Sequence, residues 1–150
     1  MADKRFNSRE IIDKVLKTVE NNENIIKKIV EILKSIPHYT WVGVYLIEGE
    51  YLVLRHYIGR PTEHTRIRVE QGICGAAFVD EQTIIVPDVS LDERHIACSV
   101  ETKSEIVVPI WSGNRIIGEI DIDSDFPDAF TAEDQKMLER VADVLGDVIG

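Results

Sequence analysis

Apolar side chains recur every three or four positions through the first 37 residues, which is the spacing of amphipathic helices. The two apolar series consist of Ile11, Ile12, Val15, Leu16 and Val19, then Ile25, Ile26, Ile29, Val30 and Leu33. The polar run NNEN at 21–24 separates them. Asn7, with Glu10 three positions later, forms a helix-start pattern, and Pro37 ends the second series. We therefore expect two helices whose apolar faces pack on a sheet or on the helices of a partner.

From residue 38 onward the apolar pattern is that of strands. Two hairpins are indicated, by YTWVGVYLI and YLVLRHYI around EGE, and by SEIVVPIW and RIIGEIDIDS around SGN. Between them lie the strand candidates RIRV and TIIVPDV and the small-residue segment GICGAAF, which suits a tightly packed helix start. Thr131 and Asp134 form a capping box before a closing amphipathic helix. The pattern predicts an α+β fold in which helices flank a largely antiparallel sheet.

Length and charge narrow the class of protein. The 150 residues are 44% hydrophobic, which is enough for the core of one domain. Asp and Glu total 27 against 17 for Lys and Arg, and the net charge of -10 argues against nucleic-acid and anionic-membrane partners. The N-terminal segment lacks the apolar stretch of a secretion signal, so we expect a cytoplasmic protein. In that reducing compartment, Cys74 and Cys98 are not expected to form a structural disulfide.

Three carboxylates alternate along the last strand candidate. Glu119, Asp121 and Asp123 share one face of that strand, because successive side chains point to opposite sides. One interpretation is an ordinary solvated strand face. The other is a concave pocket, in which the carboxylates raise one another's pKa values and one of them keeps a proton near neutral pH. Glu105, on the preceding strand of the same hairpin, is placed to reach such a pocket.

Cys98 lies in a loop of 14 residues, 90–103, which is long for a compact domain. Loops of this length tend to be functional or disordered. A thiolate is a strong nucleophile. A nucleophilic sulfur that faces carboxylic acids suits a reaction in which an oxygen is protonated while sulfur is attacked, and the reduction of a sulfoxide is such a reaction.

A metal site is the competing interpretation of the cysteines. His64, Cys74, His95 and Cys98 supply two nitrogens and two sulfurs, a ligand set that zinc accepts. The spacing between Cys74 and His95 is irregular, and no second C-x-x-C or H-x-x-H pair supports the site. The simplest interpretation of each cysteine is a small core residue.

Several segments together resemble the free methionine-(R)-sulfoxide reductases, which are stand-alone GAF domains. The segments are TWVGVYLI, TRIRVEQGICGAAF, TIIVPDV, HIACSVETKSEIVVPI and GEIDIDSD, and the resemblance covers about residues 38 to 149. It implies one GAF-type domain over 1–150, with N-terminal helices over 1–37 and the GAF core over 38–149. It also implies that the substrate-binding and oxygen-activating acids are Glu105, Asp121 and Asp123, and that a pocket tryptophan is Trp41.

The same resemblance assigns the cysteines. The catalytic cysteine of the family falls on Cys98 in HIAC, and its second cysteine falls on Cys74 in GICG. Where the family usually reads CTRI, with a resolving cysteine, this chain reads HTRI and carries His64. Two recycling routes stay open: a Cys74–Cys98 disulfide, and direct reduction of oxidised Cys98 by an external thiol.

The implied activity is reduction of free L-methionine (R)-sulfoxide to methionine by Cys98, with thioredoxin or another thiol as reductant and no cofactor or metal. A homodimer through the terminal helices is a further option. The alternative function is a non-enzymatic GAF sensor for a small molecule or nucleotide, although an acidic pocket suits a phosphate poorly.

Overall fold

One antiparallel sheet forms the centre of the protein. The computed structural model describes residues 6–19, 24–94 and 100–150. Within these ranges six strands pair in the order β3-β2-β1-β6-β5-β4, and each neighbouring pair is antiparallel. The strands are β1 (Trp41–Glu48), β2 (Tyr51–Ile58), β3 (Arg66–Arg68), β4 (Ile84–Val86), β5 (Ser104–Ser112) and β6 (Arg115–Ser124). The α+β fold with an antiparallel sheet is confirmed.

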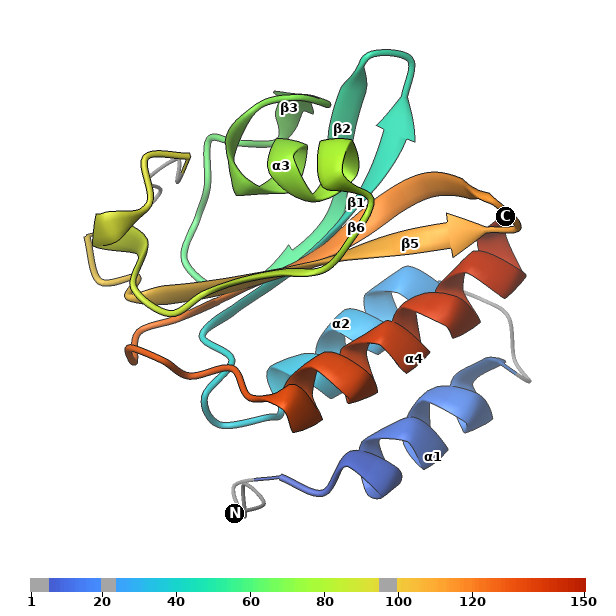
Figure 1. Cartoon of the computed structure of the whole chain (residues 1–150). Coiled ribbons are helices and arrows are strands. Elements are labelled where there is room, and N and C mark those ends of the chain that lie inside the picture. Colours follow the sequence, from blue (N-terminus) through green and yellow to red (C-terminus); the bar gives the residue numbers. More distant parts are fainter. Residues whose placement is uncertain (1–5, 20–23, 95–99) are drawn as a thin grey trace.

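Helices cover both faces of this sheet. Two of them, α2 (Ile25–Lys34) and α4 (Ala132–Ile149), pack on one face, and α1 (Ser8–Val19) packs on these two helices on the side away from the sheet (Figure 1). The remaining helix, α3 (Gly72–Asp80), lies on the other face. The predicted helix starts are present, because Asn7 Oδ1 accepts a hydrogen bond from the Glu10 amide at 3.1 Å and Thr131 forms a capping box with Asp134. Within the described ranges, no helix is both long and apolar enough to cross a membrane.

The two predicted hairpins are also present. Each turns at a glycine with a left-handed backbone, Gly49 with φ 64° and Gly113 with φ 62°. The predicted loop over 90–103 begins in a short 3-10 helix, η1 (Val89–Leu91), and ends at β5. Residues 95–99 lie outside the described ranges, and with them His95 and the predicted nucleophile Cys98.

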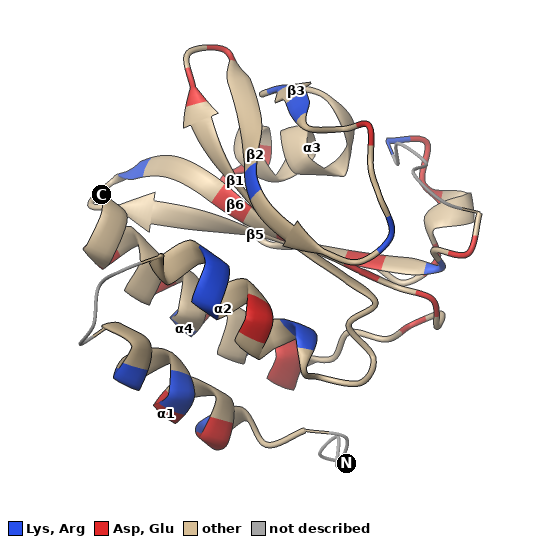
Figure 2. Cartoon of the chain, turned by 180° about the vertical axis from the view of Figure 1, so that it is seen from behind, with Lys and Arg blue, Asp and Glu red and all other residues tan. Residues whose placement is uncertain are grey.

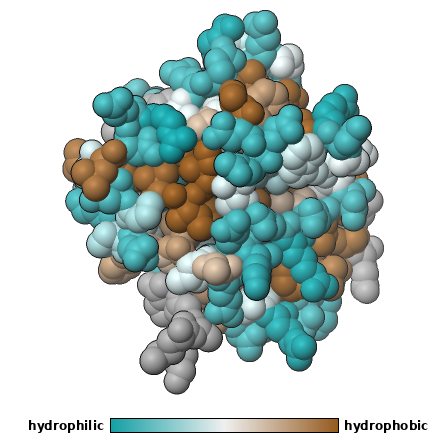
Figure 3. Space-filling view, in the orientation of Figure 1, coloured by the Kyte–Doolittle hydropathy of each residue, from teal (hydrophilic) through white to brown (hydrophobic). Residues whose placement is uncertain are grey.

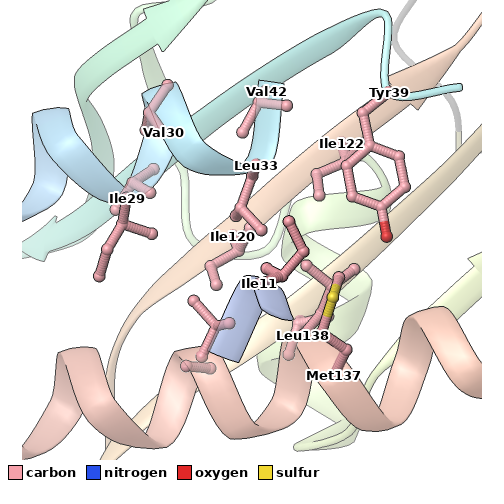
Figure 4. Close-up of a cluster of buried hydrophobic side chains, with 14 of the residues drawn as sticks. Ile11, Ile29, Val30, Leu33, Tyr39, Val42, Ile120, Ile122, Met137 and Leu138 are labelled. Carbon is pink, nitrogen blue, oxygen red and sulfur yellow. The ribbon is translucent and has the colours of Figure 1, made fainter. Parts of the chain in front are cut away.

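The main hydrophobic core lies between the sheet and helices α2 and α4, and it continues between these helices and α1. Ile120 and Ile122 of β6 are fully buried there, and they pack with Ile29 and Leu33 of α2 and Leu138 of α4 (Figure 4). Because strand side chains alternate, this apolar row on β6 directs the residues between them to the opposite face. The core therefore decides which way the β6 carboxyl groups point.

Charged residues occur on the strands of the sheet as well as on the helices that surround it. Figure 2 shows Lys and Arg together with Asp and Glu on α1 and α2, whereas the central strands β5 and β6 also carry acidic segments. Hydrophilic residues cover much of the face drawn in Figure 3 and surround a hydrophobic group near its centre. Acidic residues are rare on the central strands of a sheet, because these strands are usually buried. Their presence here marks the region of the functional site.

A buried carboxylate joins the helix layer to the start of β1. Asp134 Oδ1 accepts hydrogen bonds from His38 Nε2 at 2.9 Å and from the Tyr39 hydroxyl at 2.5 Å, and Oδ2 accepts one from the Thr131 amide at 2.8 Å. Burial opposes ionisation of Asp134, but the hydrogen bonds from His38, Thr131 and Tyr39 outweigh it and hold the pKa of Asp134 below its ordinary value. The ionised carboxylate thus fixes the first turn of α4 to the segment before β1.

Replacing Asp134 with Asn tests this connection. The amide keeps the shape but loses the charge that the buried donors need, so we expect the free energy of unfolding to fall by about 3 kcal/mol at pH 7. Urea unfolding followed by circular dichroism measures the change. Asp143→Asn, on the exposed side of the same helix, is the matched control and should change stability by less than about 0.5 kcal/mol. Equal losses for the two variants would contradict the anchoring role of Asp134.

Candidate active site

The face of the sheet that α3 covers is organised in rows across three central strands. Residues that pair directly on antiparallel strands point to the same side of the sheet. The rows across β1, β6 and β5 are Trp41–Asp123–Glu105, Gly43–Asp121–Val107 and Tyr45–Glu119–Pro109. Every row has a carboxylate of β6 at its centre, and Glu105 of β5 adds a fourth carboxyl group beside Asp123.

These four carboxyl groups are buried. The exposed fractions are 6% for Glu105, 0% for Glu119, 7% for Asp121 and 8% for Asp123. The interpretation of the β6 carboxylates as a solvated strand face is therefore wrong. They lie in a hollow of the protein, as the pocket interpretation predicts.

A pocket opens over the first two rows. It encloses about 400 Å³ of empty space, part of which is open to solvent. Its lining includes Trp41, Cys74, Glu105, Asp121 and Asp123, together with apolar side chains such as Ile67 and Ile73. The structure thus brings together five of the six predicted site residues, and the sixth, Cys98, lies outside the described ranges. Their individual roles stay predictions.

Trp41 forms one wall of the pocket and is fixed from several sides. Its indole Nε1 donates to the Arg60 carbonyl at 3.1 Å, and its ring stacks on Tyr57 with 5.5 Å between ring centroids. Gly43 makes room for it, because a Cβ at that position would lie 2.4 Å from the indole ring. Gly59 lies against the other side, where a Cβ would lie 2.6 Å from the ring. The two glycines leave the space that the indole ring occupies, and the contacts with Arg60 and Tyr57 fix its orientation.

Cys74 lies in the first turn of α3 and points at the acids. Its Sγ donates a hydrogen bond to Asp121 Oδ2 at 3.5 Å. A helix N-terminus ordinarily favours a thiolate. Here burial raises the pKa of the Cys74 thiol well above its ordinary value, and the charges of Asp121, Glu119 and Glu105 raise it further. Cys74 is consequently a protonated thiol at neutral pH.

Three of the four carboxyl groups have raised pKa values for the same reason. Burial, followed by the charge of Asp123, raises the pKa of Glu105 to about 8. Burial and the charge of Asp121 raise the pKa values of Asp123 and Glu119 well above their ordinary range. Carboxyl groups that are protonated near neutral pH can donate a hydrogen bond to an oxygen, and one that has lost its proton can accept one from an ammonium group.

The guanidinium group of Arg60 lies close enough to the site to act on the charge of Asp123. Arg60 pairs with both carboxylate oxygens of Asp125, with Nη1 3.0 Å from Oδ2, and its Nε lies 4.0 Å from Glu101. Its charge lowers the pKa of Asp123, but less than burial and Asp121 raise it. Arg60 thus offsets only part of the negative charge that the pocket would carry if its acids ionised.

Two residues at the site, Tyr45 and Glu119, had no assigned role in the sequence analysis. Tyr45 lines the pocket beside Trp41, and its hydroxyl donates to the His64 carbonyl at 2.7 Å. The alternation from Trp41 through Gly43 to Tyr45 is the signal that could have found it. Glu119 was recognised as part of the acidic row but not as a fully buried neighbour of Cys74.

The predicted zinc set is only partly described. His64 and Cys74 both line the pocket, whereas His95 and Cys98 lie outside the described ranges. Among the described residues, the candidate ligand atoms that approach one another within 4.8 Å belong to Cys74, Glu105 and Asp121 instead.

Comparison with known proteins identifies the family. Residues 21–149 match the GAF domain model. GAF domain-containing protein A of Dictyostelium discoideum is 42% identical over 132 residues, which cover 87% of this chain and 83% of that protein. A free methionine-R-sulfoxide reductase of Saccharomyces cerevisiae is 34% identical over 156 aligned residues, which cover 93% of this chain and 86% of that protein. The chain belongs to the free methionine-R-sulfoxide reductase family of GAF domains.

A solved structure agrees with this assignment. The X-ray structure of the free methionine-R-sulfoxide reductase from Neisseria meningitidis in complex with its substrate is 32% identical. The two structures align over 99% of this chain and 91% of the Neisseria chain, with a TM-score of 0.90. The family and the fold that the sequence segments implied are thereby confirmed.

The buried acids predict how stability depends on pH. The folded state keeps the Glu105 proton up to about pH 8, whereas an unfolded glutamate loses it near its ordinary pKa of 4.5. Because the folded pKa is raised, this stabilisation is complete below pH 4.5 and is lost as the pH rises through 8.

We expect Glu105→Gln to flatten the decline of the free energy of unfolding between pH 5 and 8. The change in slope should reach up to about 1.4 kcal/mol per pH unit, which corresponds to one proton. Urea unfolding at several pH values measures it, with Glu63→Gln at an exposed position as the control. Parallel curves for the wild type and Glu105→Gln would show that Glu105 is ionised in the folded protein.

Proposed function

We propose that this protein reduces free L-methionine (R)-sulfoxide to methionine, with Cys98 as the nucleophile. The observation that carries the proposal is the row of Trp41, Asp123 and Glu105 across β1, β6 and β5, in which an aromatic wall stands beside two buried carboxyl groups. An amino acid with an apolar, sulfur-containing side chain offers a matching set of groups.

Each part of the substrate has a partner of suitable chemistry in the pocket. Trp41 and the apolar lining suit the methylene and methyl groups that flank the sulfur. A protonated acid among Glu105, Asp121 and Asp123 suits the sulfoxide oxygen, to which it donates a hydrogen bond. An ionised acid of the same cluster suits the ammonium group, which is present in the free amino acid and absent from a residue within a peptide chain.

The proposed reaction starts with the thiolate of Cys98, which precedes β5 by six positions. Its sulfur attacks the sulfoxide sulfur and forms a transient sulfur–sulfur bond, while a carboxyl proton moves to the sulfoxide oxygen. The resulting hydroxyl group is then transferred from the substrate sulfur to the Cys98 sulfur as the sulfur–sulfur bond breaks. Methionine leaves with an electron pair on its sulfur, and Cys98 becomes a sulfenic acid. General acid catalysis by a positioned carboxyl group typically contributes about 10²–10⁴-fold.

Cys74 is proposed to complete the cycle. Its protonated thiol does not compete with Cys98 for the substrate, because the thiol form is a poor nucleophile. Asp121 accepts its hydrogen bond and, once ionised, is placed to take its proton. The Cys74 sulfur then attacks the Cys98 sulfenic acid, a disulfide forms and water leaves. A dithiol such as thioredoxin reduces the disulfide and is itself oxidised.

The setting of the reaction is also a proposal. A cycle of free thiols requires a reducing compartment, which supports a cytoplasmic location. A homodimer through the terminal helices belongs to the same proposal. The alternative function, a sensor for a phosphate-bearing ligand, has less support, because such a ligand would meet three buried carboxyl groups in the pocket.

The substrate proposal is tested with separated epimers. With the thioredoxin system, the protein should convert free methionine (R)-sulfoxide to methionine and leave the (S) epimer. N-acetylation removes the ammonium charge, so kcat/KM should fall about 10- to 100-fold, the effect of one charge-assisted hydrogen bond of about 1.5–3 kcal/mol. Chromatographic quantification of methionine measures both. Cys98→Ser is the control and should be inactive with an unchanged circular dichroism spectrum. Equal rates on the N-acetylated substrate would exclude the ammonium-binding role of the acids.

The recycling step is tested by mass spectrometry after one equivalent of substrate. We expect a Cys74–Cys98 disulfide, which joins residues 24 positions apart and requires Cα atoms within about 4.4–6.8 Å. Cys74→Ser should accumulate the Cys98 sulfenic acid and slow turnover with thioredoxin. An intact Cys74 thiol after oxidation, together with normal turnover by Cys74→Ser, would instead establish direct reduction of Cys98 by the external thiol.

A further inference from the structure

We propose that the pocket is also a binding site for a thiophilic divalent cation of the Zn²⁺ class, held by Cys74, Glu105 and Asp121. One ligand atom from each residue, a sulfur and two carboxyl oxygens, lies within 4.8 Å of the other two. The three side chains are buried, and they come from three different elements, α3, β5 and β6. Neither the GAF fold nor the reductase activity assigns a metal to this position.

Unpartnered oxygens around the three ligands support a cation independently. Both carboxyl oxygens of Glu119 and Oδ1 of Asp123 are buried and have no hydrogen-bond partner among the described residues. Asp123 lines the pocket itself, and Glu119 neighbours Asp121 on the same face of β6. Buried polar atoms without a partner indicate a missing water or ion, because leaving such atoms unpaired costs free energy. Water molecules bound to a cation would donate hydrogen bonds to these oxygens, which would then form the second coordination shell of the metal.

The negative charge of the pocket also favours a bound cation. Three carboxyl groups and a thiol line the pocket, whereas Arg60, which lowers the pKa of Asp123 only in part, is already paired with Asp125. A divalent cation would supply the missing positive charge, and its thiol and carboxyl ligands would release their protons on binding.

The mixture of ligand atoms selects the kind of ion. Mg²⁺ and Ca²⁺ prefer sites made of oxygen alone, whereas zinc accepts sulfur and carboxylate oxygen together. Zinc–sulfur bonds of about 2.3 Å and zinc–oxygen bonds of about 2.1 Å at a tetrahedral ion place a sulfur and an oxygen ligand about 3.6 Å apart. The observed distance between Cys74 Sγ and Asp121 Oδ2 is 3.5 Å. Three protein ligands leave the fourth position to water, an arrangement typical of open zinc sites.

Such an ion would occupy the place proposed for the substrate's ammonium group and would hold Cys74 as a thiolate ligand. Metal binding and turnover would therefore exclude each other, and zinc would protect the thiol from oxidation. The site itself depends only on the geometry of the pocket, so its test is independent of the proposed function.

Cobalt(II) reports the ligands of a zinc site through its absorption. Addition of Co²⁺ to the reduced full-length protein should produce the near-ultraviolet band of a sulfur–cobalt bond, and stoichiometric Zn²⁺ should abolish it. Cys74→Ser should lose this band, whereas Cys98→Ser, the matched cysteine control, should keep it. Asp121→Asn retains both thiols and should weaken Co²⁺ binding at least about 10-fold, since loss of an outer-shell partner alone costs 10–100-fold. Glu63→Gln, on the exposed surface, should leave the affinity unchanged.

Three results would overturn the proposal: no sulfur–cobalt band in the reduced wild type, a band that persists in Cys74→Ser, or a band that disappears in Cys98→Ser. Circular dichroism of each variant checks that a lost band does not reflect a lost fold. Activity toward methionine (R)-sulfoxide is measured separately. A protein that binds cobalt through Cys74 but reduces no sulfoxide would refute the proposed function and leave the metal site standing.

Discussion

The burial of a row of carboxyl groups on β6 is the constraint on which the rest of the site depends. Ile120 and Ile122 must face the helix layer because they complete the main core, and the alternation of the strand then sends Glu119, Asp121 and Asp123 into the opposite hollow. Ionised carboxylates at such short spacing in a buried place would repel one another strongly. Burial and this repulsion raise the pKa values of Glu119 and Asp123, so that these acids are suited to donate protons.

The pocket is built by elements that approach β6 from both sides and from above. β5 contributes Glu105, which pairs with Asp123, and β1 contributes Trp41, which pairs with Asp123 from the opposite edge of β6. α3 contributes Cys74, whose thiol donates a hydrogen bond to Asp121. Burial affects the sulfur and the oxygens in the same direction, because it disfavours the charged form of each. The protons that Cys74, Glu105 and Asp123 hold in this hollow are available to a developing negative charge.

The local features of the protein could be predicted from the sequence, whereas the features formed by distant segments could not. The Asn7 and Thr131 helix starts, the two hairpins and the shared face of the β6 acids all follow from residues a few positions apart. The contact between Cys74 and Asp121 depends on where α3 settles over the sheet, and the bond between His38 and Asp134 joins residues 96 positions apart. Neither leaves a periodic signal. The resemblance to a known family, rather than periodicity, was what brought Trp41 and Cys74 into the predicted site.

The short segment before β1 links the two sides of the sheet. His38 and Tyr39 are bound to Asp134 in the helix layer, and only two positions after Tyr39 the chain places Trp41 in the wall of the pocket. A local opening of the first turn of α4 would release this segment, so the helix end and the aromatic wall behave as one cooperative unit. Amide hydrogens at the start of α4 will consequently exchange more slowly when a ligand occupies the pocket on the far side of the sheet.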